Sequence, residues 1–353
     1  MALITIKNVV IRGMAACVPS KIEENSDYPY FDDNELDRMI PTIGIERRRV
    51  LEKEKTCADL ACKAAEKLLN ELGWEKESID LLVFCSPDRD YILPDTACII
   101  QGKLGLSKST MAFDMTLGCT GWTYSMTNVC SLLSSGCIKR ALLLTGNMGT
   151  YECAYTDKTA YPLFSDSGVT TALEYKNGAS PIFCQLGTDG KNYEDIIIHD
   201  GGARNGVTEN SLLLKDFGPN IKRSRLHMEM KGMEVFAFAL KTAPKSVEEL
   251  FDYCQINKDE VDCYFFHQAN YYMVKKIIKK MKIDPEKAPF SLLNFGNTGA
   301  CSIPFTMITE RAELLRNNHL KNVGCSFGVG LSWASLFFET DHIIIPELIE
   351  FDN

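Results

Sequence analysis

The sequence lacks the features that would place the chain in a membrane or on a nucleic acid. No run approaches the ~18 apolar residues that a membrane-spanning helix requires. Basic side chains are outnumbered, since 38 Lys and Arg against 47 Asp and Glu give a formal net charge of −9, and this balance disfavours the broad positive surface used for duplex binding. Hydrophobic residues make up 45% of the chain and charged residues 24%, as in ordinary folded proteins. We therefore expect a folded protein that binds neither membrane nor nucleic acid.

Motifs for disulfide, metal and nucleotide sites are also missing. The 14 cysteines are too sparse for a disulfide scaffold and are predicted to be free thiols. They form no Cys-x-x-Cys pairs with the spacing of a zinc site, and the chain has no glycine-rich phosphate loop. The first 19 residues do not have the basic and then apolar pattern of a secretory signal. These absences predict a cytoplasmic protein with no metal and no bound cofactor.

A unit of helix, turn and buried strand occurs twice. A predicted helix begins at the capping pair Thr56 and Asp59, and a short apolar strand follows at residues 79–84. Residues 74–84, with the sequence WEKESIDLLVF, resemble residues 256–266, with the sequence INKDEVDCYFF. Strands that alternate with helices are typical of a mostly parallel sheet covered by helices.

The repeat predicts an α/β layered fold made of two duplicated, pseudo-symmetric halves. We expect the halves to span residues 1–178 and 179–353, each with a mixed, mostly parallel sheet and helices on its faces. Parallel sheets place chemistry at the carboxyl ends of their strands. Reactive residues are therefore expected in the turns after Leu117, Phe266 and Leu293, where predicted strands end.

Three residues in these turns are candidates for catalysis. Cys119, in GCTGW, precedes a predicted helix over residues 120–135, and a helix N-terminus lowers the pKa of a thiol from its usual ~8.5. His267 directly follows the repeated strand, and Asn297 follows the next predicted strand. Because strand ends from two pseudo-symmetric halves can converge, we expect Cys119, His267 and Asn297 to form one site.

The motifs around these residues, in this order, identify a family. GCTGW at Cys119, HQAN at His267, GNTGACSIP at Asn297 and FGVGLSWAS at residues 327–335 resemble the ketoacyl-acyl-carrier-protein synthase III group of thiolase-fold enzymes. The resemblance covers residues 4–338. It implies a decarboxylative Claisen condensation between a Cys-bound acyl starter and malonyl-acyl carrier protein, giving a 3-oxoacyl product. It also implies a homodimer in fatty acid or polyketide biosynthesis, with thioester substrates and no cofactor.

The resemblance implies a role for each matching residue. Cys119 would carry the acyl group as a thioester, and His267 and Asn297 would hydrogen-bond the malonyl thioester carbonyl and stabilise the enolate left by carbon dioxide. The backbone N–H groups of Cys119 and Val329 would form the oxyanion hole. Because valine takes a positive φ only at a cost, Val329 in a loop that is usually all glycine leaves the conformation of that loop open.

Several positions depart from the family pattern and bear on the starter. Arg38 and Thr42 stand where acetyl-CoA-dependent members have a Trp and an Arg, and Tyr272 and Lys158 replace two further Arg residues. The starter is therefore expected on either coenzyme A or an acyl carrier protein. Leu93 occupies the place of a Phe that a partner subunit contributes to the acyl pocket in such enzymes, which predicts a different acyl-chain limit.

A basic helix face is the predicted docking site for the carrier protein. At 100° per residue, a set of lysines occupies one side of the helix that follows His267, while the other side is apolar. In a chain of net charge −9, a concentrated basic patch suits an acidic partner such as an acyl carrier protein, although a merely solvated face is the ordinary alternative. The predicted docking residues are Lys275, Lys276, Lys279 and Lys280.

Other activities of the same superfamily fit the sequence less well. A thiolase would place a second cysteine two residues before its last glycine run, where Ser326 stands next to Cys325. A hydroxymethylglutaryl-CoA synthase would have a glutamate base near the cysteine, and the corresponding loop at residues 86–95 contains none. Iterative condensation as in plant-type polyketide synthases stays open, as do the extender and the pathway. Acyl transfer from Cys119 to an alcohol or amine, and a non-catalytic carrier-binding homologue, are the alternatives to condensation.

Overall fold

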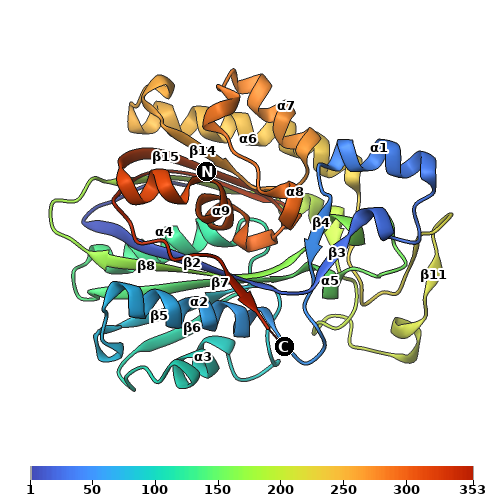
Figure 1. Cartoon of the computed structure of the whole chain (residues 1–353), viewed down its shortest axis with the longest axis horizontal. Helices are drawn as coiled ribbons and strands as arrows, with labels where there is room; N and C mark the ends of the chain where they lie inside the picture. Colours follow the sequence, from blue (N-terminus) through green and yellow to red (C-terminus); the bar gives the residue numbers. More distant parts are fainter. Residues whose placement is uncertain (1, 353) are drawn as a thin grey trace.

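Two β-sheets form the framework of the protein (Figure 1). The computed structural model describes residues 2–352. The first sheet has the strand order β17 (Ile349–Phe351), β2 (Val9–Pro19), β8 (Asp166–Tyr175), β7 (Arg140–Met148), β5 (Leu81–Cys85) and β6 (Met111–Met115). The second has the order β1 (Ala2–Ile6), β9 (Ile182–Thr188), β16 (Ser332–Asp341), β15 (His319–Gly328) and β14 (Cys263–Phe266).

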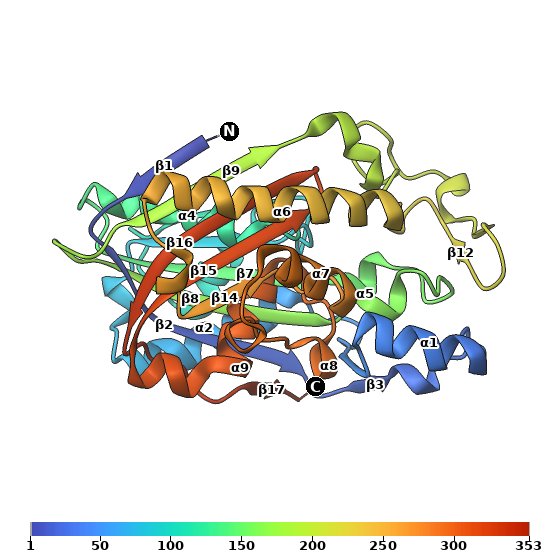
Figure 2. The same cartoon turned by 90° about the horizontal axis from the view of Figure 1, so that it is seen from above.

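Helices lie between the two sheets and on both outer faces. The central layer contains α4 (Gly121–Ser134) and α9 (Ser302–Asn317), whose side chains join the inner faces of both sheets in one hydrophobic core. The first sheet is covered by α2 (Cys57–Leu72) and α3 (Thr96–Leu104). The second is covered by α6 (Gly232–Cys254) and α7 (Tyr271–Met281). Figure 2 shows α6 running across β9, β16 and β15. The predicted layered fold of two similar halves is confirmed.

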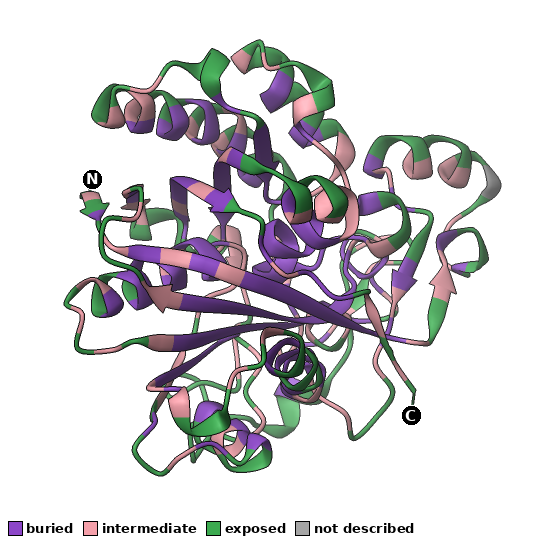
Figure 3. Ribbon diagram, turned by 60° about the vertical axis from the view of Figure 1, so that its left-hand side comes forward, coloured by how far each residue is buried: buried purple, intermediate pink, exposed green. Residues whose placement is uncertain are grey.

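Local sequence signals explain why these elements form where they do. The Thr56 N–H donates to the Asp59 carboxylate over 3.1 Å at the start of α2, and Gly73 ends the helix with a left-handed φ of 62°. The capping box supplies a partner for a backbone donor that a helix N-terminus leaves free, and glycine adopts positive φ at no steric cost. The central strands of both sheets are buried along most of their length (Figure 3), because both faces of each sheet carry helices.

The second sheet differs from the sequence prediction in its strand directions. Three of the neighbouring pairs in the first sheet are parallel, whereas β14 and β15 are the parallel pair in the second and the remaining pairs are antiparallel. The strand predicted before Asn297 is also wrong. Residues there form the one-turn helix α8 (Leu292–Phe295), so the second sheet has no counterpart of β6 beside β14.

The remaining elements lie around the sheets. The N-terminal β1 pairs with β9, and the C-terminal β17 pairs with β2, so each end of the chain joins the sheet of the other half. A division at residue 178 stays a prediction. None of the helices in residues 2–352 has the length and apolar character needed to cross a bilayer. The remaining elements are α1 (Asp33–Ile43), α5 (Gly149–Glu152), β3 (Ile22–Glu24) with β4 (Arg47–Arg49), β10 (Ile196–Ile197) with β13 (Glu229–Met230), and β11 (Lys215–Asp216) with β12 (Lys222–Arg223).

Candidate active site

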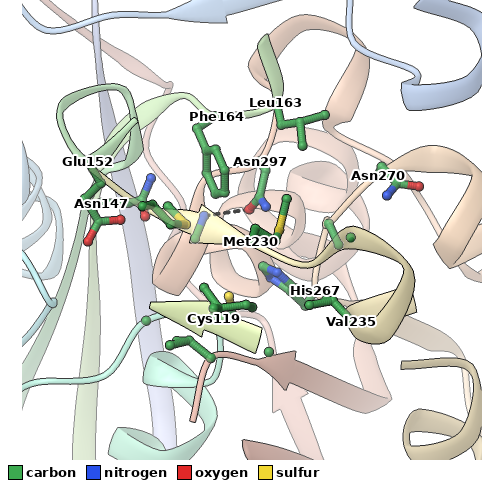
Figure 4. Close-up of a pocket in the computed structure, with 18 of the residues that line it drawn as sticks. Cys119, Asn147, Glu152, Leu163, Phe164, Met230, Val235, His267, Asn270 and Asn297 are labelled. Atoms are coloured by element: carbon green, nitrogen blue, oxygen red, sulfur yellow. Dashed lines mark hydrogen bonds between the residues drawn. The ribbon is translucent and has the colours of Figure 1, made fainter. Parts of the chain in front are cut away.

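The three predicted catalytic residues line one cavity of about 430 Å³. Cys119 lies between the end of β6 and the start of α4, His267 follows β14, and Asn297 follows α8. Figure 4 shows the side chains of all three around the cavity. The two halves of the chain therefore contribute to a single site, as the pseudo-symmetry predicts.

His267 is held in one orientation by a neighbour that sequence reasoning did not single out. Its backbone N–H donates to the Cys325 carbonyl over 2.8 Å, which continues the pairing of β14 with β15. The ring Nδ1 lies 2.7 Å from Ser302 Oγ at the start of α9. If the Ser302 hydroxyl donates to Nδ1, the ring proton resides on Nε2 and is available as a donor. Ser302 is part of the GNTGACSIP motif, which was its only signal in the sequence.

Two backbone hydrogen bonds hold Asn297 in place. Its N–H donates to the Leu163 carbonyl over 2.8 Å, and its carbonyl accepts from Ser165 N–H over 3.0 Å. The side-chain Oδ1 accepts from the Gly299 N–H over 2.9 Å (dashed line in Figure 4). With Oδ1 engaged, the Nδ2 amide group is left as a hydrogen-bond donor at the cavity.

Burial dominates the electrostatics of both Cys119 and His267. Removal from water raises the pKa of the Cys119 thiol above its usual value, although the backbone N–H groups of Val329 and Cys119 act to lower it. The predicted lowering of this pKa at the start of α4 is therefore wrong, because loss of solvation outweighs the helix terminus. Burial lowers the pKa of His267 to about 4. The imidazole is consequently neutral near pH 7.

The loop around Val329 is compatible with the predicted oxyanion hole. Positive φ values fall on Gly328 and Gly330, at 155° and 137°, and Val329 itself does not require one. A Cβ on Gly328 would lie 2.6 Å from Cys119 Sγ, so only glycine permits this approach. The Ser332 hydroxyl donates to the Val329 carbonyl over 2.8 Å and lies 2.8 Å from Thr120 Oγ1. These contacts hold the loop beside the nucleophile.

The predicted docking lysines are exposed on α7, whose first turn borders the cavity. Asn270 caps this helix by accepting from Met273 N–H over 2.9 Å, and both residues line the cavity. The opposite face of α7 packs into the core under the second sheet. The lysines therefore lie on the solvent side of α7 next to the site, and the Lys280 ammonium group also donates to the Leu240 carbonyl over 2.9 Å. The exposed lysines are Lys275, Lys276, Lys279 and Lys280.

The residues discussed for starter binding lie apart from the reacting groups. Leu93 is 80% exposed and does not line the cavity of its own chain, so its predicted role at the acyl pocket of a partner subunit stays a prediction. Arg38 and Thr42 are exposed on α1. Lys158 Nζ is 2.5 Å from Glu35 Oε1, and the half-exposed Tyr272 stacks on Phe236.

The structure also brings to the cavity two polar residues that no motif indicated. Glu152, the last residue of α5, and Asn147, near the end of β7, both line it. Residues 86–95 contain no glutamate, but Glu152 lines the same cavity as Cys119. Cys325, in contrast, is buried in β15, where its thiol lies 3.9 Å from the Ala243 carbonyl and outside the cavity.

No group of three or more His, Cys, Asp or Glu residues within residues 2–352 is arranged to hold a metal ion. That the reaction proceeds without metal or cofactor stays a prediction. All 14 cysteines are free.

Comparisons with known proteins agree on one family. The family model described as 3-oxoacyl-[acyl-carrier-protein] synthase III matches residues 113–190, and the model of its C-terminal part matches residues 251–340. The chain is 31% identical over 332 residues to a β-ketoacyl-[acyl-carrier-protein] synthase III of Clostridium perfringens, covering 93% of this chain and 98% of that protein. A relative of the same description from Aliarcobacter butzleri is 29% identical over 333 residues, with 93% and 96% covered. The crystal structure of a 3-oxoacyl-(acyl-carrier protein) synthase from Burkholderia xenovorans superposes with a TM-score of 0.93, at 34% identity over 99% of each chain.

Proposed function

The chain belongs to the β-ketoacyl-acyl-carrier-protein synthase III family, and we propose that it condenses an acyl starter bound to Cys119 with malonyl-acyl carrier protein. It is an acyltransferase. The observation that supports these residue roles is the single cavity lined by Cys119, His267 and Asn297, with the Val329 loop held against the nucleophile. The product is a 3-oxoacyl-acyl carrier protein.

The first step loads the starter. The Cys119 sulfur attacks the carbonyl of the incoming thioester, and the backbone N–H groups of Cys119 and Val329 stabilise the negative oxygen of the tetrahedral intermediate. The bond to the departing sulfur then breaks. The thiol proton of Cys119 ends on the thiolate that leaves, so the step consumes no additional reagent.

The second step forms the carbon–carbon bond. His267 Nε2–H and Asn297 Nδ2–H donate to the malonyl thioester carbonyl, where negative charge develops as the carboxylate carbon leaves as carbon dioxide. The resulting enolate attacks the acyl carbonyl on Cys119. The electron pair of the broken C–S bond returns to the Cys119 sulfur, which takes a proton from solvent.

A product assay tests the function. The enzyme is incubated with a panel of acyl-CoA and acyl-carrier donors together with malonyl-acyl carrier protein, and the carrier is analysed by mass spectrometry. We expect a 3-oxoacyl carrier whose formation requires both substrates. Acyl esters or amides formed without release of carbon dioxide would instead support transfer to an alcohol or amine.

The two half-reactions should depend differently on pH. Because burial raises the pKa of Cys119, its thiolate fraction, and with it the rate of acyl loading, should rise between pH 7 and 9. Because the pKa of His267 is lowered to about 4, the ring stays neutral, and carbon dioxide release should change little between pH 6 and 8. Loading is measured by intact mass and decarboxylation by carbon dioxide release from Cys119→Ala. A decarboxylation midpoint between pH 6 and 8 would mean that His267 titrates there.

The basic face of α7 supports docking of an acidic carrier protein. Reversing Lys275, Lys276, Lys279 and Lys280 to Glu should lower kcat/KM for malonyl-acyl carrier protein and remove most of its decrease with salt. The physical reason is that a positive patch accelerates encounter with an acidic partner, and salt screens this attraction over a Debye length of about 8 Å at physiological ionic strength. Rates are measured from low to high salt.

Two controls separate docking from general charge effects. Reversal of four exposed lysines on the first half of the chain produces the same change in net charge and should leave the salt dependence intact; these are Lys63, Lys67, Lys76 and Lys108. A small malonyl thioester should react almost equally with the wild type and the α7 variant. Equal losses for carrier-bound and small thioesters would show that α7 acts on the active site rather than on docking.

Three exposed apolar residues support a homodimer, since exposed apolar side chains suit an interface between subunits. Ile92 and Leu93 are 81% and 80% exposed, and Tyr151 is 77% exposed. Ile92→Asp with Leu93→Asp should therefore convert a dimer to a monomer in light scattering at micromolar concentration, whereas Val207→Asp, at a residue 60% exposed elsewhere, should not. A monomeric wild type would contradict the dimer and the role of Leu93 in a partner's pocket.

Sequence departures bear on the acyl donor. Arg38 and Thr42 stand where acetyl-CoA-dependent members have a Trp and an Arg, which supports delivery of the starter by either coenzyme A or a carrier protein. The free state of the cysteines supports a reducing compartment such as the cytoplasm.

A further inference from the structure

The acyl-binding part of the cavity combines an apolar wall with two polar side chains that have no assigned role in condensation. Figure 4 places Glu152 and Asn147 to the left of Cys119, with His267 and Val235 to its right. In this view the polar pair lies on the side of Cys119 away from His267. The apolar part of the lining includes Leu163, Phe164, Ile196, Ile198, Met228 and Met230.

The side chain of Glu152 is half-buried, and its carboxyl group has no hydrogen-bond partner among residues 2–352. The side chain lines both the Cys119 cavity and a second cavity next to it. Burial, followed by the nearby Asp88 and Asp166, raises its pKa well above the usual value. The two aspartates are satisfied, since Asp88 accepts from Met148 N–H and Asp166 accepts from Leu51 N–H, each over 2.8 Å. The raised pKa favours the protonated carboxyl group, which can both donate and accept a hydrogen bond.

Asn147 presents an acceptor whose orientation is fixed. Its Nδ2 donates to the Ser165 carbonyl over 2.8 Å, which assigns the amide and leaves Oδ1 on the other side. Oδ1 packs against Gly299, where an added Cβ would lie only 1.8 Å away, so the position depends on the glycine. Among residues 2–352, no donor reaches this oxygen.

These two groups are complementary to an alcohol. A hydroxyl can accept from the protonated Glu152 carboxyl group and donate to Asn147 Oδ1, whereas an unsubstituted alkyl chain offers neither group a hydrogen-bond partner. We propose that the starter accepted by Cys119 is a hydroxyacyl group whose hydroxyl binds Glu152 and Asn147. This rests on the proposed function, because it names the substrate class of that same site.

Binding to the Cys119→Ala protein tests the proposal without requiring any transfer. Dissociation constants are measured for octanoyl-pantetheine and for its hydroxyoctanoyl positional isomers, since pantetheine is common to both kinds of donor. At least one isomer should bind about 10-fold or more tighter than octanoyl-pantetheine, because a site built to pair a hydroxyl discriminates against its absence. Glu152→Leu should reverse this order, and Glu152→Gln, which keeps a donor and an acceptor, should retain part of it.

A control variant shows whether the effect belongs to Glu152. Tyr151→Phe removes a hydroxyl at the adjacent residue, which is 77% exposed and outside the Cys119 cavity, and should retain the preference. Equal affinity for octanoyl-pantetheine and every isomer, or a preference that survives Glu152→Leu, would overturn the proposal. Tightest binding of an aminooctanoyl analogue would also overturn it, since Glu152 would then act as a carboxylate. Failure of the condensation itself is recognised separately, by absence of acyl labelling on wild-type Cys119.

Discussion

Replacing Cys119 with alanine is expected to abolish condensation and stable acyl labelling while some decarboxylation of malonyl-acyl carrier protein persists. The acyl group requires the sulfur as its attachment point, and a side-chain methyl group offers no nucleophile. The enolate, in contrast, is stabilised by His267 and Asn297, which line the same cavity and are not altered. Intact-mass spectrometry reports the acyl adduct, and carbon dioxide release reports the residual step.

The other 13 cysteines provide the control for this result. Cys98 and Cys137 are exposed on the surface, so they are the thiols most open to adventitious acylation. Cys98→Ala with Cys137→Ala should load the starter like the wild type. Labelling of the Cys119→Ala protein at either position, at a rate matching the wild type, would remove Cys119 from the nucleophile role.

Alanine substitutions at His267 and Asn297 should have the second large effect, on decarboxylation. Each variant should still accept an acyl group on Cys119 but release carbon dioxide about 10²-fold or more slowly, because each removes a transition-state hydrogen bond in a site shielded from water. The buried, neutral ring of His267 and the free Nδ2 of Asn297 are the donors that these variants lose. Single-turnover loading and carbon dioxide release are measured separately for each variant.

Ser302→Ala tests whether His267 must donate a hydrogen bond or only needs to fill the site. This variant leaves the imidazole in place but removes the hydroxyl that lies 2.7 Å from Nδ1, so its decarboxylation should fall between that of the wild type and His267→Ala. Acyl loading should be retained in all three variants. Carbon dioxide release at the wild-type rate from His267→Ala and Asn297→Ala would exclude the assigned roles.

Much of the architecture was predictable because its determinants are local. The capping pair Thr56 and Asp59 and the terminal Gly73 define α2 from sequence alone, and the alternation of lysine and apolar positions defines the buried face of α7. The strand expected before Asn297 failed for a physical reason. Its residues are apolar enough for a strand, but they form the single turn α8, and short apolar segments do not distinguish these two outcomes by periodicity.

Some residues of the site could be predicted from sequence motifs, and others only from the folded structure. Cys119, His267 and Asn297 were recognisable because each stands in a motif at the end of a predicted element. Glu152 and Asn147 were not, since their relevance depends on the packing of α5 and β7 around the cavity. The direction of the Cys119 pKa was also mispredicted, because the degree of burial around a turn is a property of the whole fold.

A single turnover of isolated acyl-enzyme tests the central claim most directly. Wild-type protein carrying one acyl group on Cys119 is freed of donor and mixed with malonyl-acyl carrier protein, and the acyl-enzyme, carbon dioxide and carrier products are followed together. We predict that loss of the acyl mass from Cys119 matches, one for one, the appearance of carbon dioxide and of a 3-oxoacyl carrier extended by two carbons. Departure of the acyl group as a free acid, ester or amide, without carbon dioxide, would contradict decarboxylative condensation at this site.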